Sequence, residues 1–383
     1  MSMKFGRKNE IKLDPLAYSF MLIGESGIGK TSTIHEYVEK LAGPDGYLFV
    51  ETGHEDGGDA IDGLNYIAAT TWGDDYDEYM NTIGFHTLVE DIVANRATDW
   101  KDLRVLVIDT LDELFTSLAE PEVIRLHNKE NPNKKVKSIK AAFGGFQAGE
   151  DKAVELVVND LWALKSVGVS FVIIGHTKNR TMHDSVTGED YMQLTTNMSN
   201  RYFNAIKDKV HVLGVAFIDR NIVREKGRTN VVTGRTETKG VVKSEYRKIT
   251  FRDENYSIDS KSRFKDIVPE IPLDADALIK AFNDAIAASR TRTSESIDES
   301  KKKQDEQNEE FNRRVAQKES AAKKQKELDD TINNIVMFFT DNRDNRDILK
   351  PIMKAIKDMG YSSPKEIDNI DDADKIMKLI DEA

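Results

Sequence analysis

The residues best suited to chemistry stand together near the N-terminus, in the run Gly24-Glu25-Ser26-Gly27-Ile28-Gly29-Lys30-Thr31. This run has the spacing G-x-x-x-x-G-K-[ST] of a phosphate-binding loop. Its glycines allow backbone N–H groups to surround phosphates, and Lys30 can reach the β and γ phosphates. The hydroxyl of Thr31 can bind Mg²⁺. Together with Ser32, these residues are the predicted binding site for a nucleoside triphosphate, with ATP as the expected ligand.

An acidic residue that could hold the same metal ion ends a second apolar run. The segment 105–108 consists of Val, Leu, Val and Ile, and Asp109 follows it directly. A carboxylate at the end of a buried strand holds Mg²⁺ in many phosphoryl-transfer sites. An aspartate that only begins a solvated loop is the alternative, and the phosphate-binding loop upstream argues against it. We therefore predict Thr31 and Asp109 as the Mg²⁺ ligands.

Hydrolysis also needs a group that orients the attacking water, and the sequence offers several carboxylates. Glu51 ends an apolar run, Glu55 follows it closely, and Asp112 and Glu113 lie just past the strand that ends in Asp109. We favour Glu51, followed by Glu55 and Glu113, as the catalytic carboxylate. For each of these residues, an ordinary surface acid is an equally good interpretation.

Two further places could carry polar groups to a nucleotide. His176 follows the apolar run 171–175, at the predicted tip of a strand, where it could sense the γ-phosphate. The run Lys261-Ser262-Arg263 could act as an arginine finger on the nucleotide of a neighbouring subunit. A structural histidine and a solvated basic loop are the respective alternatives.

The elements that must position these residues are visible in the hydrophobic pattern. From Phe20 to Asp219, short apolar runs alternate with helical periodicity, which is typical of a parallel sheet with crossover helices. The expected strands cover residues 19–23, 47–50, 104–108 and 170–174, with two more at 211–218 and 246–251. The expected helices cover residues 31–41, 88–94, 151–167 and 274–289. The fold class is therefore α/β.

The rest of the chain is divided by composition. Residues 1–289 form the predicted core, with a β-hairpin insertion at 220–245. Between Ile297 and Leu328 the only large apolar side chains are Phe311 and Val315. Residues 290–330 are therefore a charged linker, either helical through i,i+4 charge pairs or disordered, and the alternating signs favour the helix. Apolar periodicity returns in residues 331–383, which predict a small all-helical module.

Bulk composition excludes several classes of protein. The 383 residues contain no cysteine, so disulfides and thiolate metal sites are absent. No apolar stretch is long enough for a membrane helix, and the N-terminus lacks a secretory signal, so we expect a cytoplasmic protein without membrane partners. The net charge of −12 does not exclude nucleic acid, because binding requires only a local basic surface.

Four motifs occur in a recognisable order: GESGIGKTS, VLVIDTLDEL, FVIIGHTK and SKSRF. Together they resemble the phage-encoded RecA-like ATPases assigned to single-strand annealing and recombination, over about residues 19–272. The resemblance implies a RecA-like core with a mostly parallel sheet and helices on both faces. It implies binding of ATP and Mg²⁺, a homo-oligomeric ring or filament, and action on single-stranded DNA beside a single-strand-binding or other replication or recombination protein. If the protein is phage-encoded, the host cytoplasm is its expected location.

The resemblance also assigns roles to residues. Lys30, Thr31 and Asp109 match the phosphate and metal ligands, His176 takes the place of the polar sensor, and Lys261 with Arg263 resembles the K-x-R finger. The family places a catalytic glutamate shortly after the second strand, which leaves Glu51 and Glu55 open.

Loops that contact DNA should follow the third and fourth strands. The first is the basic tract 129–140, with Phe143 and Phe146 nearby as rings on which bases could stack, and the second spans residues 178–201. An exposed polar loop with two half-buried aromatic residues is an equally weighted interpretation of the first segment.

Other activities share the phosphate-binding loop. A regulatory nucleotide-binding switch, which recruits partners without turnover, is the main alternative. A small-molecule kinase fits the separate acidic strand and the long charged tail less well. A GTPase is disfavoured because no N-K-x-D motif reads guanine, since the run 128–131 is Asn-Lys-Glu-Asn.

Overall fold

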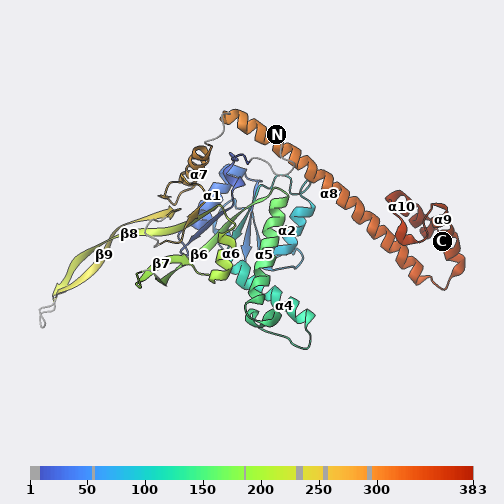
Figure 1. Ribbon diagram of the computed structural model, residues 1–383, viewed down its shortest axis with the longest axis horizontal. Coiled ribbons are helices and arrows are strands. Elements are labelled where there is room, and N and C mark those ends of the chain that lie inside the picture. The colour runs from blue at the N-terminus through green and yellow to red at the C-terminus, as the bar shows by residue number, and fades with distance from the viewer. Residues whose placement is uncertain are drawn as a thin grey trace. The chain divides into compact units, whose positions relative to one another are not determined.

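The computed structural model describes residues 9–53, 57–184, 187–229, 236–252, 258–290 and 296–382. The chain divides into two compact units (Figure 1). Unit 1 comprises Met1–Ala94 and Asp99–Glu306, and unit 2 comprises Asn95–Thr98 and Gln307–Ala383. None of the helices in the described ranges has the length and apolar character needed to cross a membrane.

A large mixed sheet forms the centre of unit 1. Its main strands follow the order β11-β9-β8-β1-β6-β5-β2-β3-β4, while β10 pairs with β8 and β7 pairs with β6. The strands are β1 (Phe20–Gly24), β2 (Tyr47–Thr52), β3 (Tyr66–Thr71), β4 (Thr82–Gly84), β5 (Val105–Asp109), β6 (Ser170–His183), β7 (Asp190–Thr196), β8 (Val212–Thr229), β9 (Thr236–Thr250), β10 (Lys261–Ser262) and β11 (Glu270–Pro272). From β8 to β4 neighbouring strands are parallel, so the expectation of a mostly parallel α/β sheet is confirmed.

Helices cover both faces of this sheet. The helices of unit 1 are α1 (Lys30–Ala42), α2 (Phe85–Ala94), α3 (Leu111–Glu113), α4 (Glu120–Glu130), α5 (Ala148–Ser166), α6 (Asn200–Lys207) and α7 (Ala275–Ser289), with a π-helical turn at Leu114–Ala119 between α3 and α4. Alternate residues of the strands point to opposite faces. One face packs against α1 and α7, and the other packs against α2 and α5.

The central strands are apolar along their whole length because both of their faces are buried. All five residues of β1 and all five of β5 are buried, including Phe20, Leu22 and Val107. Strands buried on both faces read as continuous apolar runs rather than as alternating patterns. The carboxyl ends of β1, β6, β5 and β2 therefore meet at one edge of a rigid platform.

Two antiparallel hairpins extend from this platform. β6 continues past the parallel region and pairs with β7, from Thr177↔Thr196 to His183↔Asp190. β8 and β9 pair from Val215↔Thr250 to Thr229↔Thr236 and leave the sheet as a long two-stranded ribbon (Figure 1). We call these two features the β6–β7 hairpin and the β8–β9 ribbon.

Unit 2 contains the helices α9 (Arg346–Asp358) and α10 (Ile370–Asp381) and most of the long helix α8 (Ile297–Asp341). It has its own core, formed by Leu328, Ile335, Ile352, Ile356, Ile367, Ala373 and Ile376. The charged segment beyond residue 296 is helical, and this helix runs without a break past residue 330. Helical pairs of opposite charge, such as Glu310 with Arg314, support it.

Candidate functional site

The phosphate-binding loop connects the end of β1 to the first residue of α1. Gly24 ends β1, and a Cβ atom there would lie 2.9 Å from the Cβ and the carbonyl oxygen of Ala216 on β8, so only glycine fits. Gly27 and Gly29 have φ angles of 72° and 106°, in the left-handed region that glycine adopts without strain. The helix begins at Lys30, so the loop presents the N–H groups of a helix N-terminus to an anion.

The Lys30 ammonium group lies inside this loop. Only 6% of the residue is exposed, and Nζ donates hydrogen bonds to the carbonyl oxygens of Gly24 (3.1 Å) and Glu25 (3.0 Å). A buried ammonium group is stable only when its protons are well paired. Phosphate oxygens are stronger partners than the loop carbonyls, because charge-assisted hydrogen bonds are about twice as strong as neutral ones.

Thr31 and Asp109 are brought together across the sheet edge. The Thr31 hydroxyl donates a hydrogen bond of 2.7 Å to Oδ2 of Asp109, which is the last residue of β5 and is 7% exposed. A hydroxyl and a carboxylate are hard oxygen ligands, the type that Mg²⁺ prefers. The described residues hold no cluster of three or more acidic or histidine side chains that could bind a metal alone. The pair therefore suits a Mg²⁺ ion that shares its remaining ligands with phosphate and water.

Glu51 lies beside this pair. It is 4% exposed, and its Cα is the direct neighbour of the Asp109 Cα in the pairing of β2 with β5. Its Oε1 accepts a hydrogen bond from the backbone N–H of Gly58. The adjacent residues Thr52 and Thr110 exchange two hydrogen bonds, of 2.6 and 2.9 Å, which fix the two strand ends relative to each other.

The other two candidate glutamates are placed differently. Glu113 is half-buried at the end of α3, where its Oε2 accepts a hydrogen bond from the Ser117 hydroxyl, and it packs against Gly53 just beyond β2. Glu55 lies outside the described residues. Of the two described glutamates, Glu51 is the one whose Cα pairs directly with that of Asp109.

His176 is held by an acid that the sequence left without a role. Its Cα pairs with that of Gly24, which places it next to the phosphate-binding loop. Asp112 Oδ2 contacts both the ring Nδ1 (2.6 Å) and the backbone N–H (3.0 Å) of His176. Asp112 is 8% exposed, and its Oδ1 is buried with no hydrogen-bond partner among the described residues. A buried carboxylate that contacts both groups fixes the orientation of the imidazole ring.

Lys261 and Arg263 lie at the other end of the sheet. β10 pairs with the beginning of β8, where Ser262 faces Val212, and Val212 faces Phe20 at the start of β1. At about 3.3 Å per residue, the length of β1 separates this edge from the phosphate-binding loop by roughly 13 Å. Lys261 Nζ donates to the Lys207 carbonyl (2.6 Å), and Arg263 Nη2 donates to the Asp208 carbonyl (2.7 Å). These residues are therefore not part of the nucleotide site of their own chain.

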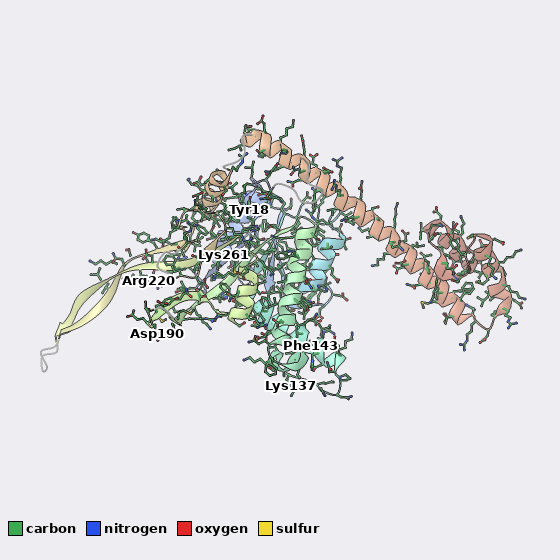
Figure 2. All side chains as sticks on the ribbon, in the orientation of Figure 1. Tyr18, Lys137, Phe143, Asp190, Arg220 and Lys261 are labelled. Atoms are coloured by element: carbon green, nitrogen blue, oxygen red, sulfur yellow. The ribbon has the colours of Figure 1, made fainter. Side chains whose placement is uncertain are left out.

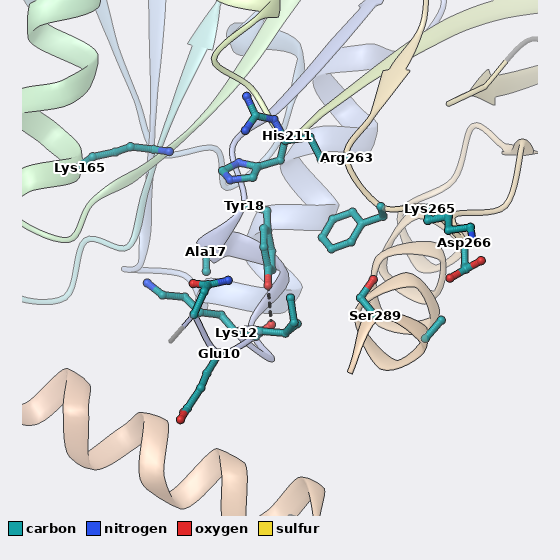
Figure 3. Close-up of a pocket in the computed structure, with 14 residues that line it drawn as sticks. Glu10, Lys12, Ala17, Tyr18, Lys165, His211, Arg263, Lys265, Asp266 and Ser289 are labelled. Carbon is teal, nitrogen blue, oxygen red and sulfur yellow. Dashed lines mark hydrogen bonds between the residues drawn. The ribbon is translucent and has the colours of Figure 1, made fainter. Parts of the chain in front are cut away.

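A basic pocket of about 760 Å³ adjoins Arg263 at this end of unit 1 (Figure 3). Lys12, Lys165, Lys265 and Arg263 line it, together with the acids Glu10 and Asp266 and the aromatic residues Tyr18, His211 and Phe264. Burial, followed by the nearby cations Lys165 and Arg263, lowers the pKa of His211 to about 4. Its Nδ1 accepts a hydrogen bond from the Ser19 N–H (3.1 Å), so the neutral ring is a fixed part of the wall.

An arginine outside the recognised motifs contacts the phosphate-binding loop from the β8–β9 ribbon. Arg247 lies on β9, and its Nη1 donates a hydrogen bond of 3.0 Å to the carbonyl oxygen of Ile28. Nothing in the sequence pattern distinguishes it from the other basic residues of the ribbon, because the contact depends on how β9 pairs with β8 beside β1.

The two segments expected to contact DNA are linked in the structure. Arg201, in α6 after the β6–β7 hairpin, donates hydrogen bonds to Asp151 and to Gln147 at the start of α5. The Tyr202 ring stacks on Phe115 with centroids 4.3 Å apart, and its hydroxyl bonds to Glu120 (2.8 Å). These contacts join α6, which follows β6, to the elements that follow β5.

A fully exposed aromatic ring lies just beyond the first of these segments. Five consecutive residues, 143–147, have positive φ angles, and within this run Phe146 is fully exposed. Phe143 is half-buried and packs edge-on against His127, with ring centroids 5.2 Å apart. All five lysines of the tract 129–140 are exposed, and Figure 2 labels Lys137 and Phe143 in this part of unit 1.

A family model described as an AAA domain matches residues 16–264, which is more than half of the chain and includes every described site residue from Gly24 to Arg263. No curated protein matches the sequence.

Proposed function

The chain belongs to the AAA domain family of P-loop ATPases, and from this premise we propose that it is a Mg²⁺-dependent ATPase of RecA-like type that acts on single-stranded DNA. We place that action in phage DNA recombination, annealing or replication. The proposal includes assembly into a homo-oligomer and work beside a single-strand-binding or other replication protein.

The nucleotide site supports the ATPase part of the proposal. Lys30 would bind the β and γ phosphates, and the Thr31 hydroxyl and the Asp109 carboxylate would hold Mg²⁺. The bound ion would neutralise charge on the phosphate oxygens. Glu51, at the end of β2, would orient the attacking water, and His176, held by Asp112, would respond to the γ-phosphate.

The exposed ring of Phe146 is the observation that carries the DNA part. A fully exposed phenylalanine gains nothing from the core, so burial does not explain it. Proteins that bind single strands combine aromatic rings, on which bases stack, with cations that follow the phosphates. Phe146 follows a tract with five exposed lysines, 129–140, whose net charge is +4 (five Lys and one Glu). Stacking and phosphate contacts are thus available on one surface.

The link through Arg201 supports coupling between DNA and nucleotide. Arg201 ties α6 to the start of α5, directly after Phe146, and α6 follows the β6–β7 hairpin. β6 itself contains His176 beside the phosphate-binding loop. DNA that displaces α6 or the β6–β7 hairpin would therefore also move β6, which carries His176 beside the phosphate-binding loop.

Arg263 supports the oligomeric part of the proposal. Because it lies at the opposite end of β1 from its own loop, it can act as a finger only on the nucleotide of another copy. The exposed guanidinium at this end of the sheet is available to a neighbouring subunit.

The test is steady-state ATP hydrolysis with and without single-stranded DNA, at low and moderate salt, with Lys30→Ala as the blank. We expect stimulation by DNA that weakens as salt rises, because phosphate contacts release counterions. Hydrolysis that is indifferent to DNA would refute the DNA part while leaving the ATPase intact.

The alternative is a regulatory switch that binds nucleotide and recruits protein partners without DNA-stimulated turnover. Unit 2 favours this alternative, because it has a core of its own, while the predicted site residues lie in unit 1. Stoichiometric nucleotide binding without stimulated hydrolysis would support the switch.

A further inference from the structure

The strand order separates the catalytic groups from the rest of the nucleotide. β1 stands in the middle of the sheet, with β6, β5 and β2 on one side and β8 and β9 on the other. His176, Asp109 and Glu51 all lie on strands of the first side, at the edge next to the phosphate-binding loop. The γ-phosphate and the metal ion therefore belong on the side of β6 and β5.

This placement fixes the direction of a bound triphosphate. When the γ-phosphate lies near the Thr31–Asp109 pair, the three phosphates extend across the loop. The α-phosphate and the nucleoside then lie on the side of the loop farther from Asp109. The strands on that side of β1 are β8 and β9. The nucleoside end should thus meet whatever residues stand between β9 and the N-terminus of α1.

The side chains of Arg247 and Leu273 lie at this position. A Cβ atom at Gly29 would lie 3.6 Å from Arg247 Nη1 and 3.9 Å from Leu273 Cδ2, so both residues border the loop at the start of α1. Arg247 is exposed and Leu273 is half-buried. The Leu273 N–H donates a hydrogen bond of 2.9 Å to the Arg247 carbonyl, which fixes the two backbones together.

The Arg247 side chain retains capacity to bind a ligand. A guanidinium group has five N–H donors, and the hydrogen bond to the Ile28 carbonyl uses one nitrogen, Nη1. The planar group can bind a phosphate oxygen or stack on a base, and a neighbouring apolar side chain can pack against the base. Arg247 and Leu273 together offer both kinds of contact next to the loop.

We propose that Arg247 and Leu273 form the subsite for the nucleoside of the bound nucleotide, namely the base and the ribose. The inference rests on the proposed nucleotide binding and adds to it a location for the nucleoside. It also gives the β8–β9 ribbon a direct contact with the ligand, because Arg247 lies where the ribbon joins the sheet.

A bracing role for Arg247 is the competing explanation. In that case the arginine only holds the loop in shape through the Ile28 carbonyl, and every ligand of the loop would depend on it equally. Inorganic triphosphate separates the two roles, because it fills the phosphate positions and lacks a nucleoside.

The experiment measures the Mg²⁺-dependent binding of ATP, ADP and inorganic triphosphate by isothermal titration calorimetry. The variants are Arg247→Ala, Arg247→Lys and Leu273→Ala. Lys248→Ala is the matched control, since Lys248 is the next residue of β9 and pairs instead with Asp219 (2.7 Å) and Glu270 (3.4 Å). Arg247→Lys keeps a donor for the Ile28 carbonyl, so it preserves the contact with the loop that Arg247→Ala removes.

We expect Arg247→Ala to weaken ATP and ADP binding about 10- to 100-fold, the usual effect of losing a charge-assisted hydrogen bond. Inorganic triphosphate should bind Arg247→Ala and Arg247→Lys as it binds the wild type. Leu273→Ala should weaken the two nucleotides severalfold, and Lys248→Ala should change nothing.

Three results would overturn the inference. An equal loss for all three ligands in Arg247→Ala that Arg247→Lys restores would assign Arg247 to bracing, and a loss for ATP and triphosphate but not ADP would assign it to the γ-phosphate. Unchanged affinities in every variant would remove both residues from the site. Failure of the proposed function looks different, because the wild-type protein itself would then bind neither nucleotide.

Discussion

The replacement Phe146→Ala tests the proposed DNA surface with little risk to the fold. The ring is fully exposed, so its removal exposes no core and leaves no cavity. Surface substitutions of this kind usually change the free energy of unfolding by less than about 0.5 kcal/mol. The melting temperature should therefore stay unchanged, and any loss of DNA binding would report on the ring itself.

The size of the loss follows from the stacking of one base. Base–aromatic stacking contributes about 1–3 kcal/mol per base in alanine substitutions. That range corresponds to an increase of about 5- to 150-fold in the dissociation constant for single-stranded DNA. The effect should persist at moderate salt, because stacking releases no counterions, whereas removing a lysine such as Lys137 should lower the salt slope by about 0.7.

Fluorescence anisotropy with a labelled oligothymidine gives the dissociation constant directly. Tyr79→Ala is the matched control, because Tyr79 is also almost fully exposed (94%) but belongs to a different loop, between β3 and β4. Equal affinity of Phe146→Ala and the wild type would refute the stacking argument. An equal loss in Tyr79→Ala would show that the effect is not specific to this surface.

Three other predictions follow from the site and the core. Asp112→Asn should lower kcat for ATP about 10- to 100-fold with little change in nucleotide affinity, because it weakens the hydrogen bonds that hold His176; an unchanged kcat in a steady-state assay would count against this role. Arg263→Ala should lose turnover but keep nucleotide binding, and mixing it with Lys30→Ala should restore part of the hydrolysis if the finger acts between copies; no recovery in the mixture would argue against that. Burial raises the pKa of Asp160 to about 6, above its ordinary 3.8, so the native state binds the proton of this carboxyl more tightly than the unfolded state does. The free energy of unfolding should therefore fall by up to about 3 kcal/mol as the pH rises from about 4 to 6. Asp160→Asn should accordingly raise the melting temperature at pH 7.5 but not at pH 4, and equal shifts at both pH values in a calorimeter would contradict the assignment.

The central fold could be predicted because its strands are buried on both faces. The apolar runs at β1, β2, β5 and β6 mark strands that have no polar face, and the helices between them are amphipathic. β3 and β4 were missed: Tyr66–Thr71 is only partly buried, and Thr82–Gly84 is too short for a periodic signal. Neither strand could be recognised from hydrophobic pattern alone.

The meeting of Thr31 with Asp109 could also be anticipated, because the carboxyl ends of parallel strands share one edge. The pairing of Asp112 with His176 could not, since it depends on where α3 begins relative to the middle of β6. The position of Lys261 and Arg263 depends on β10 pairing with the start of β8, and sequence spacing contains no information on that direction. Arg247 was missed for the same reason.

The short strands at the two borders of the sheet affect how copies of the protein can associate. β4 and β11 have three residues each, and β11 ends in Pro272, which has no N–H to donate. Where β9 extends beyond β11, it bears the exposed charges Lys243, Glu245 and Arg247. Short, charged and proline-containing borders resist intermolecular strand pairing, which is the first step toward fibrillar aggregates. We therefore expect concentrated protein to avoid sheet-to-sheet polymerisation, and a ring or filament to form through contacts between side chains.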